Sequence, residues 1–236
     1  MKGAIDMPSI KKETVGEAVV YTLRNTKGNE LKVTDLGARL VSMRFRDKNF
    51  ANRFLFKDDA AAGLVFVDGG KDFSKIRWQG EETLEGMKFT AKVGDKSATV
   101  IYSLSNDNEI SIIYATEGVK DISTEIVFAL PDADVRACQK GAAWEKVSEE
   151  KIYPVTEPAE VEMELGMFGY DPGCPIDYLN AGLKNATNLY SAEAEIDIIV
   201  YATQDEIHAA AVEGGIAIHT SGSGKGQTVY MIKNRR

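Results

Sequence analysis

Residues 17–46 read EAVVYTLRNTKGNELKVTDLGARLVSMRFR, and this stretch predicts three strands of one antiparallel sheet. Hydrophobic residues such as Val19, Tyr21 and Leu23 recur at every second position, which is the period of a β-strand. The turn at residues 25–29 contains a glycine and two asparagines, which tolerate the positive φ of a tight turn. Gly37 then interrupts the pattern, as glycines do at a bulge or at a close backbone approach. We therefore expect a sheet edge that turns a corner at Gly37.

The same two-residue period recurs along the rest of the chain, and no segment predicts a helix longer than about three turns. Residues 133–151 are the only stretch where a helix competes, but they keep neither period, and we expect them to be irregular with a possible strand. A glycine- and serine-rich segment at 221–226 predicts a flexible hairpin loop between the last two strands. The further expected strands cover residues 64–67, 87–93, 98–104, 110–114, 122–130, 159–165, 195–203, 207–212, 216–219 and 228–232. The sequence thus predicts an all-β protein.

The chain has 236 residues, of which 44% are hydrophobic and 27% charged, a composition typical of a globular protein with a core. We expect an N-terminal arm at residues 1–16, which either adds one strand or stays mobile, and a single domain at 17–236. The formal net charge of -8 argues against a nucleic-acid partner, which requires clustered lysine and arginine.

The two cysteines, Cys138 and Cys174, form no CxxC pair, so the sequence predicts reduced thiols rather than a zinc site or a disulfide framework. No apolar run approaches the roughly 20 residues of a membrane-spanning helix. The start of the chain shows no secretory hydrophobic region, so no signal peptide is visible. We expect a reducing compartment, either the cytoplasm or the interior of an organelle.

Several segments, in the same order along the chain, resemble the galactose mutarotase (aldose 1-epimerase) family. They are YTLRN at 21–25, LKVTDLGA at 31–38, VIYSL at 100–104, NDNEI at 106–110, IIYA at 112–115 and YATQ at 201–204. The resemblance implies a galactose mutarotase-like β-sandwich, or supersandwich, of mainly antiparallel strands with little helix. It also implies catalysis by a glutamate base and a histidine acid, with a second histidine and an aspartate holding the sugar and with no metal or cofactor.

Mutarotation removes a proton from the anomeric hydroxyl and gives one to the ring oxygen, so it requires a base and an acid on opposite sides of the sugar. The segment ISTEIVFAL at 122–130 matches the strand that carries the family's acid histidine, and Glu125 occupies the place of that histidine. A glutamate donates a proton at neutral pH only if burial raises its pKa. We therefore expect the acid to be lost.

The resemblance also implies a substrate-binding aspartate and a glutamate base. Asp171, with Tyr170 before it, resembles the family's substrate-binding aspartate, although an aspartate in a loop is also a common turn former. Glu213 is the candidate base, because it is the only late glutamate at the end of a suitable strand. His208 and His219, the only two histidines, are expected to be half-buried packing residues.

These observations predict a carbohydrate-binding domain of mutarotase type that binds a hexose or a sugar derivative and has lost catalysis. If it is active, we expect an aldose 1-epimerase-type isomerase that needs no cofactor. The alternative is a non-catalytic structural or accessory subunit of a larger assembly. That alternative predicts a protein partner and an exposed apolar patch.

Overall fold

The computed structural model describes residues 9–56, 63–66, 73–119, 122–130, 136–138, 145–147, 151–154, 157–158, 183–191, 194–204, 206–213 and 215–234. In these ranges the regular elements are all β-strands, with no helix. The prediction of an all-β chain is therefore confirmed. The arm that we expected contributes a strand at Ser9–Val15, while the expected strand at residues 159–165 lies outside the described residues.

The strands form three antiparallel sheets. The first sheet has the order β1 (Ser9–Val15), β2 (Ala18–Arg24), β3 (Glu30–Thr34), β4 (Arg39–Arg46) and β5 (Asn52–Phe54). The third sheet has the order β14 (Lys151–Pro154), β18 (Glu206–Val212), β19 (Gly215–Gly222), β11 (Ile122–Phe128) and β6 (Gly63–Phe66).

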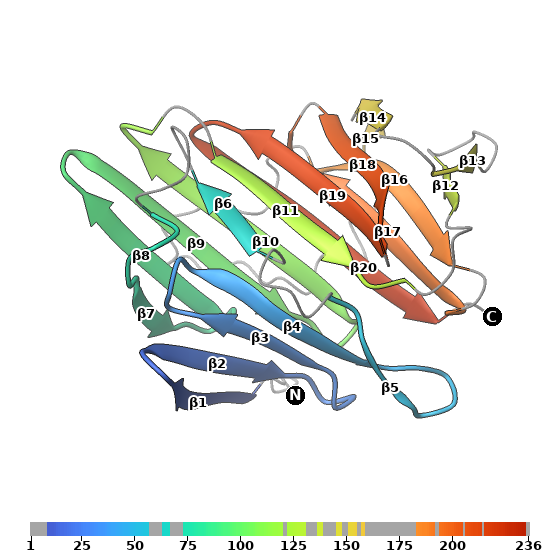
Figure 1. Cartoon of the computed structure of the whole chain (residues 1–236), viewed down its shortest axis with the longest axis horizontal. Helices are drawn as coiled ribbons and strands as arrows, with labels where there is room; N and C mark the ends of the chain where they lie inside the picture. Colours follow the sequence, from blue (N-terminus) through green and yellow to red (C-terminus); the bar gives the residue numbers. More distant parts are fainter. Residues whose placement is uncertain are drawn as a thin grey trace, which may run out of the picture.

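The large sheet has ten strands and forms the other layer. Its path is β13 (Glu145–Lys146), β12 (Arg136–Cys138), β16 (Lys184–Ser191), β17 (Ile196–Ala202), β20 (Lys225–Asn234), β10 (Glu109–Glu117), β9 (Lys96–Leu104), β8 (Met87–Val93) and β7 (Gln79–Glu82), with β15 (Glu157–Pro158) paired to β16. Figure 1 shows the first and third sheets side by side across one face of the large sheet.

Leu55 joins the first sheet to the third sheet. Its N–H donates to the Met43 carbonyl at 2.8 Å, and its own carbonyl accepts from the Ala129 N–H at 2.7 Å. Phe56 then pairs with Phe128 as an isolated bridge. Both backbone groups of Leu55 are therefore paired, one with each sheet.

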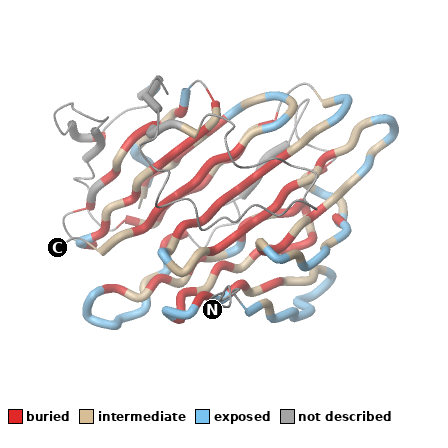
Figure 2. The backbone as a smooth tube through the Cα atoms, turned by 180° about the vertical axis from the view of Figure 1, so that it is seen from behind, coloured by how far each residue is buried: buried red, intermediate tan, exposed pale blue. Residues whose placement is uncertain are grey.

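Aromatic side chains fill the space between the two layers. Phe89 contacts Tyr21 and Tyr102 with ring centres 5.6 and 6.1 Å away, and Phe128 contacts Tyr230 at 5.4 Å. Burial raises the pKa of the Tyr102 hydroxyl well above its ordinary value, and this O–H donates to the Ala38 carbonyl at 2.5 Å. Figure 2 shows the buried segments running through the middle of the strands of both layers. The core therefore lies between the layers.

The turn at residues 25–29 fastens the first sheet to the large sheet. The Asn25 side-chain amide donates to the Ser105 carbonyl at 2.9 Å and to Asn108 Oδ1 at 3.0 Å. Asn29 Nδ2 donates to the same Asn108 oxygen at 2.5 Å. Because Asn25 and Asn108 lie in turns of different layers, these bonds hold the layers in one register. The asparagines of the opening turn thus have a tertiary role in addition to their turn conformation.

Gly37 lies where the sequence predicts an interruption, with φ +69, and it is followed by Ala38 at φ 47. The Gly37 N–H donates to the Ile76 carbonyl at 2.9 Å, and a Cβ at Gly37 would collide with the Ser74 carbonyl oxygen. A second segment of backbone therefore passes directly against this residue. Gly37 is required both for its positive φ and for this close approach.

The expected hairpin loop at 221–226 is wrong. The strands extend to Gly222 and resume at Lys225, and β19 and β20 belong to different sheets. The segment is a short corner between the layers, with Gly224 at φ +70, and a Cβ at Gly222 or Gly226 would collide with the Tyr114 hydroxyl. The prediction failed because it assumed that consecutive strands pair with each other. Here the chain passes from the third sheet to the large sheet, and Tyr114 packs against both glycines at this corner.

Replacing Gly37 with alanine tests the close approach at this corner. Gly94→Ala is the matched control, because Gly94 has a similar φ of +64 and open space at the Cβ position. Each change costs about 1–2 kcal/mol from left-handed backbone strain. Gly37→Ala should cost at least about 1 kcal/mol more in the free energy of unfolding, measured in urea, because the Ser74 backbone must move. Equal losses would contradict the account of Gly37.

Candidate functional site

The third sheet carries one row of polar side chains across its middle strands. His208 on β18 is the register partner of His219 on β19, and His219 is the register partner of Glu125 on β11. Residues directly opposite one another in an antiparallel sheet share a face, with Cβ atoms about 4.5–5.5 Å apart. His208, His219 and Glu125 therefore form a continuous line, called here the polar row.

The polar row lies on the outer face of the third sheet. Ile126 and Ile218, the chain neighbours of Glu125 and His219, are fully buried in the core, while Glu125 and His219 are half-buried. Because successive side chains of a strand point to opposite faces, the polar row faces away from the large sheet. Apolar burial thus fixes the direction of the polar groups.

Small residues adjoin the polar row on the same face. Gly63 on β6 is the register partner of Glu125 and has no side chain at the edge of the row. Ala210 and Ala217 form the next outward-facing pair along β18 and β19. On the other side of the row, Ser123 is paired with Ser221. These small side chains leave the charged groups of the row without a large neighbour on either side along the middle strands.

The two histidine rings are in contact. The His208 and His219 ring centres are 5.7 Å apart, and the ring planes meet at 88°. His208 Nε2 also lies 3.2 Å from Glu206 Oε1, and the His208 side chain is 24% exposed. The row therefore has a carboxylate near each end, Glu206 beside His208 and Glu125 beside His219.

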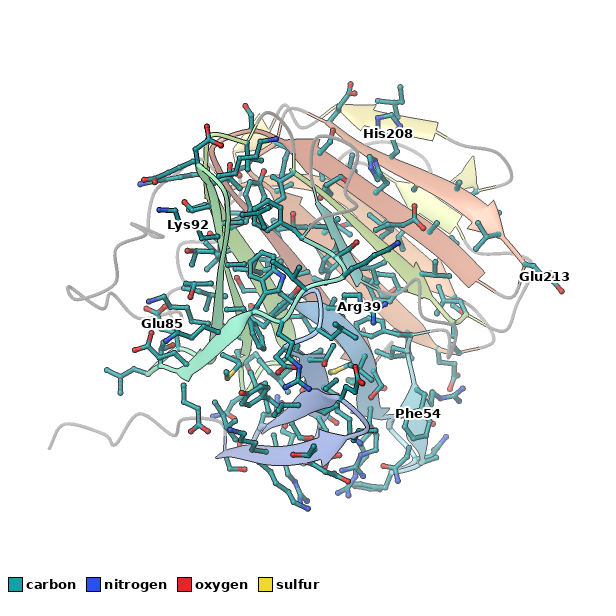
Figure 3. All side chains as sticks on the ribbon, turned by 60° about the vertical axis from the view of Figure 1, so that its left-hand side comes forward. Arg39, Phe54, Glu85, Lys92, His208 and Glu213 are labelled. Carbon is teal, nitrogen blue, oxygen red and sulfur yellow. The ribbon has the colours of Figure 1, made fainter. Side chains whose placement is uncertain are left out.

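The structure places the predicted site residues differently. Glu125 lies in the polar row, whereas Glu213 is exposed on the turn after β18. Figure 3 shows Glu213 projecting from the end of β18, far from His208. Five residues of extended chain separate the two, which span about 16 Å. Glu125 and Glu213 are therefore not brought together. Asp171 and Tyr170 lie outside the described residues.

Sequence reasoning did not identify His219 as the neighbour of Glu125. The alternation of residues 215–220 does show that His219 faces away from Ile216 and Ile218. It does not show that β19 pairs with β11, which follows only from the tertiary structure. The prediction that both histidines are half-buried is confirmed.

Within the described ranges, no group of three or more His, Cys, Asp or Glu residues is placed to hold a metal ion. The same part of the chain contains no helix that could cross a membrane. The polar row itself presents imidazole and carboxylate groups, which exchange protons.

The large sheet with two smaller sheets across one face is shared with solved structures. The GalM/aldose epimerase homologue from C. elegans aligns with a TM-score of 0.61 and 13% identity over 97% of this chain and 100% of that chain. The galactose 1-epimerase from Lactobacillus acidophilus NCFM aligns with a TM-score of 0.60 and 12% identity over 97% of this chain and 99% of that chain. The chain has the aldose 1-epimerase fold.

A third similar structure with this fold is a putative aldose 1-epimerase from Escherichia coli K12, with a TM-score of 0.55 and 9% identity over 92% of this chain and 99% of that chain. No family model matches the sequence, and no curated protein matches it. The expected mutarotase-like β-sandwich is thus confirmed at the level of the fold. Low identity means that function must be argued from the site itself.

Paired substitutions on β19 test which face the polar row occupies. Ile218→Ala should destabilise the protein by about 2–5 kcal/mol, because it removes a buried side chain from the core. His219→Ala should change the free energy of unfolding by no more than about 0.5 kcal/mol, because His219 lies on the outer face. Chemical denaturation of both variants measures this difference, and a large loss for His219→Ala would show that the histidine is part of the core.

Proposed function

We propose that the chain binds an aldose on the outer face of the third sheet and interconverts its anomers, with Glu125 and His219 as the proton-transfer pair. The observation that carries the proposal is the register of Glu125 with His219 on adjacent strands. The fold supports the choice of substrate, because the similar structures from L. acidophilus and C. elegans are named as aldose epimerases or their homologue.

The chemistry needs one base and one acid, and the pair supplies both. Glu125 and His219 share one face of the sheet and do not flank the sugar as the resemblance implies. One face can still serve both transfers, because the anomeric hydroxyl and the ring oxygen are bonded to the same carbon. The Glu125 carboxylate takes the proton of the anomeric hydroxyl, while the protonated His219 imidazole gives a proton to the ring oxygen. The bond between the anomeric carbon and the ring oxygen breaks, and an open-chain aldehyde forms. Rotation and the reverse proton transfers close the ring as the other anomer, so atoms and charge balance without a cofactor.

This proposal revises the expectation of a lost acid. In the resembling family the carboxylate is the base and the imidazole the acid, and Glu125 stands where the imidazole is expected. In this chain the imidazole comes from β19, directly beside Glu125. Both residue types are therefore present, on adjacent strands of the third sheet.

A second candidate function is that of a non-catalytic accessory subunit. Phe50 and Phe54, on the hairpin between β4 and β5, are 80% and 59% exposed. Two exposed aromatic rings on one hairpin are typical of a surface that meets a protein partner. The two exposed phenylalanines therefore favour the accessory-subunit function. They lie on a different sheet from the polar row.

Polarimetry of freshly dissolved α-D-glucose or α-D-galactose tests the proposed reaction. The chain should accelerate the change in optical rotation. Glu125→Gln and His219→Asn should each lower the rate by about 10²–10⁴-fold, because each removes a proton-transfer group. Glu117→Gln, an exposed glutamate on β10, should leave it unchanged. Asp171→Asn should also abolish the activity if Asp171 holds the sugar, as we predict.

Two results would contradict the proposal. One is a rate of the unaltered chain equal to the spontaneous rate, together with no sugar binding by calorimetry at millimolar concentration. That outcome supports the accessory-subunit alternative. The other is an active chain whose rate survives both substitutions in the pair but falls with Glu213→Gln, which would return the base to the position predicted from the sequence.

A further inference from the structure

The only two histidines among the 236 residues lie directly opposite one another on adjacent strands. The separation of His208 and His219 in the sequence matches no common metal-binding motif. Only the register of β18 and β19 brings the two side chains together. Their rings are in contact, with centres 5.7 Å apart and planes at 88°. Two half-buried imidazoles on the open face of a rigid sheet are a preformed pair of nitrogen ligands.

The spacing of the rings fits a shared metal ion. Imidazole nitrogens bind zinc at about 2.0–2.1 Å, so two imidazoles on one tetrahedral ion have ring centres about 5 Å apart. The observed separation is close to that value. The rings meet edge to face, so one ring must turn about its soft second torsion to direct both lone pairs at one ion.

Glu206 supplies a second, independent feature of a metal site. Its Oε1 lies 3.2 Å from His208 Nε2. In the tautomer that carries its proton on Nε2, the ring donates to this carboxylate and Nδ1 is the ligand atom. A carboxylate that holds one ring nitrogen while the other binds the metal is the usual outer-shell arrangement of metal-bound histidine. On the far side of His219, Glu125 is within one strand spacing and adds negative charge.

We propose that His208 and His219 form a binding site for a divalent transition-metal ion of the zinc and copper class. The two imidazoles are the protein ligands, Glu206 orients His208, and water completes the coordination. Imidazole ligands favour these ions over magnesium and calcium, which prefer oxygen. The site goes beyond the proposed sugar chemistry and does not rest on it. Because His219 belongs to both, a bound ion should also slow mutarotation.

Calorimetric titration of the untagged full chain with Zn²⁺ at pH 7.5, with no sugar present, tests the site. One ion should bind, and His208→Ala and His219→Ala should each weaken binding by at least about tenfold. Glu206→Gln should weaken it by about 10–100-fold, as loss of an outer-shell partner does. Binding should fall steeply when the pH is lowered to 5, because imidazole must be neutral to ligate. Mg²⁺ should not compete.

A cysteine variant provides the matched control. Zinc also binds thiolates, so the double variant Cys138→Ser with Cys174→Ser should retain the full affinity of the unaltered chain. Loss of binding in that variant, affinity that is unaffected by both histidine substitutions, or no binding by the unaltered chain would each overturn the proposal. Urea denaturation of every variant distinguishes a lost ligand from a lost fold. Zinc is titrated without sugar and mutarotation is assayed without zinc, so failure of this site and failure of the proposed function are measured separately.

Discussion

The burial of one face of the large sheet beneath the two smaller sheets is the constraint on which the rest of the structure depends. Tyr102, Tyr114 and Tyr230 project from β9, β10 and β20 into this interface and are essentially fully buried. Their polar ends limit how the layers fit, because a buried hydroxyl without a partner costs about 1–3 kcal/mol. Tyr102 donates to the Ala38 carbonyl of the first sheet, and the Tyr114 hydroxyl accepts from Gln204 Nε2 at 3.2 Å. The Tyr102 bond thus ties the large sheet to the first sheet, while the bond between Tyr114 and Gln204 lies within the large-sheet layer.

The same constraint creates the candidate site. Because Ile126 and Ile218 are buried in the core, the alternation of side chains along a strand directs Glu125 and His219 outward. The pairing of β11 with β19 and of β19 with β18 then aligns three titratable side chains on one rigid surface. Rigid sheet positions hold such groups with little reorganisation, which favours both proton transfer and ligand binding.

Much of the fold can be predicted from the sequence, because each strand shows a two-residue alternation of apolar and polar side chains within its own segment. The opening stretch predicts β2, β3 and β4 and the interruption at Gly37, and the structure confirms all four features. Which sheet a strand joins, in contrast, depends on contacts with residues far away in the sequence. The segment at 221–226 looks like a hairpin loop, yet it crosses between layers because Tyr114 packs against Gly222 and Gly226. Glu125 and His219 were missed as a pair for the same reason, since only the register of β11 and β19 makes them neighbours.

Nuclear magnetic resonance of the two histidine rings during titration with an aldose tests the central claim most directly. The untagged chain gives two sets of imidazole signals, and substitution of His208 assigns them. The account predicts that the His219 signals shift saturably as the sugar binds to the outer face of the third sheet. Saturable binding or turnover of the sugar with both sets of imidazole signals unmoved would contradict it, because the ligand would then lie elsewhere on the molecule.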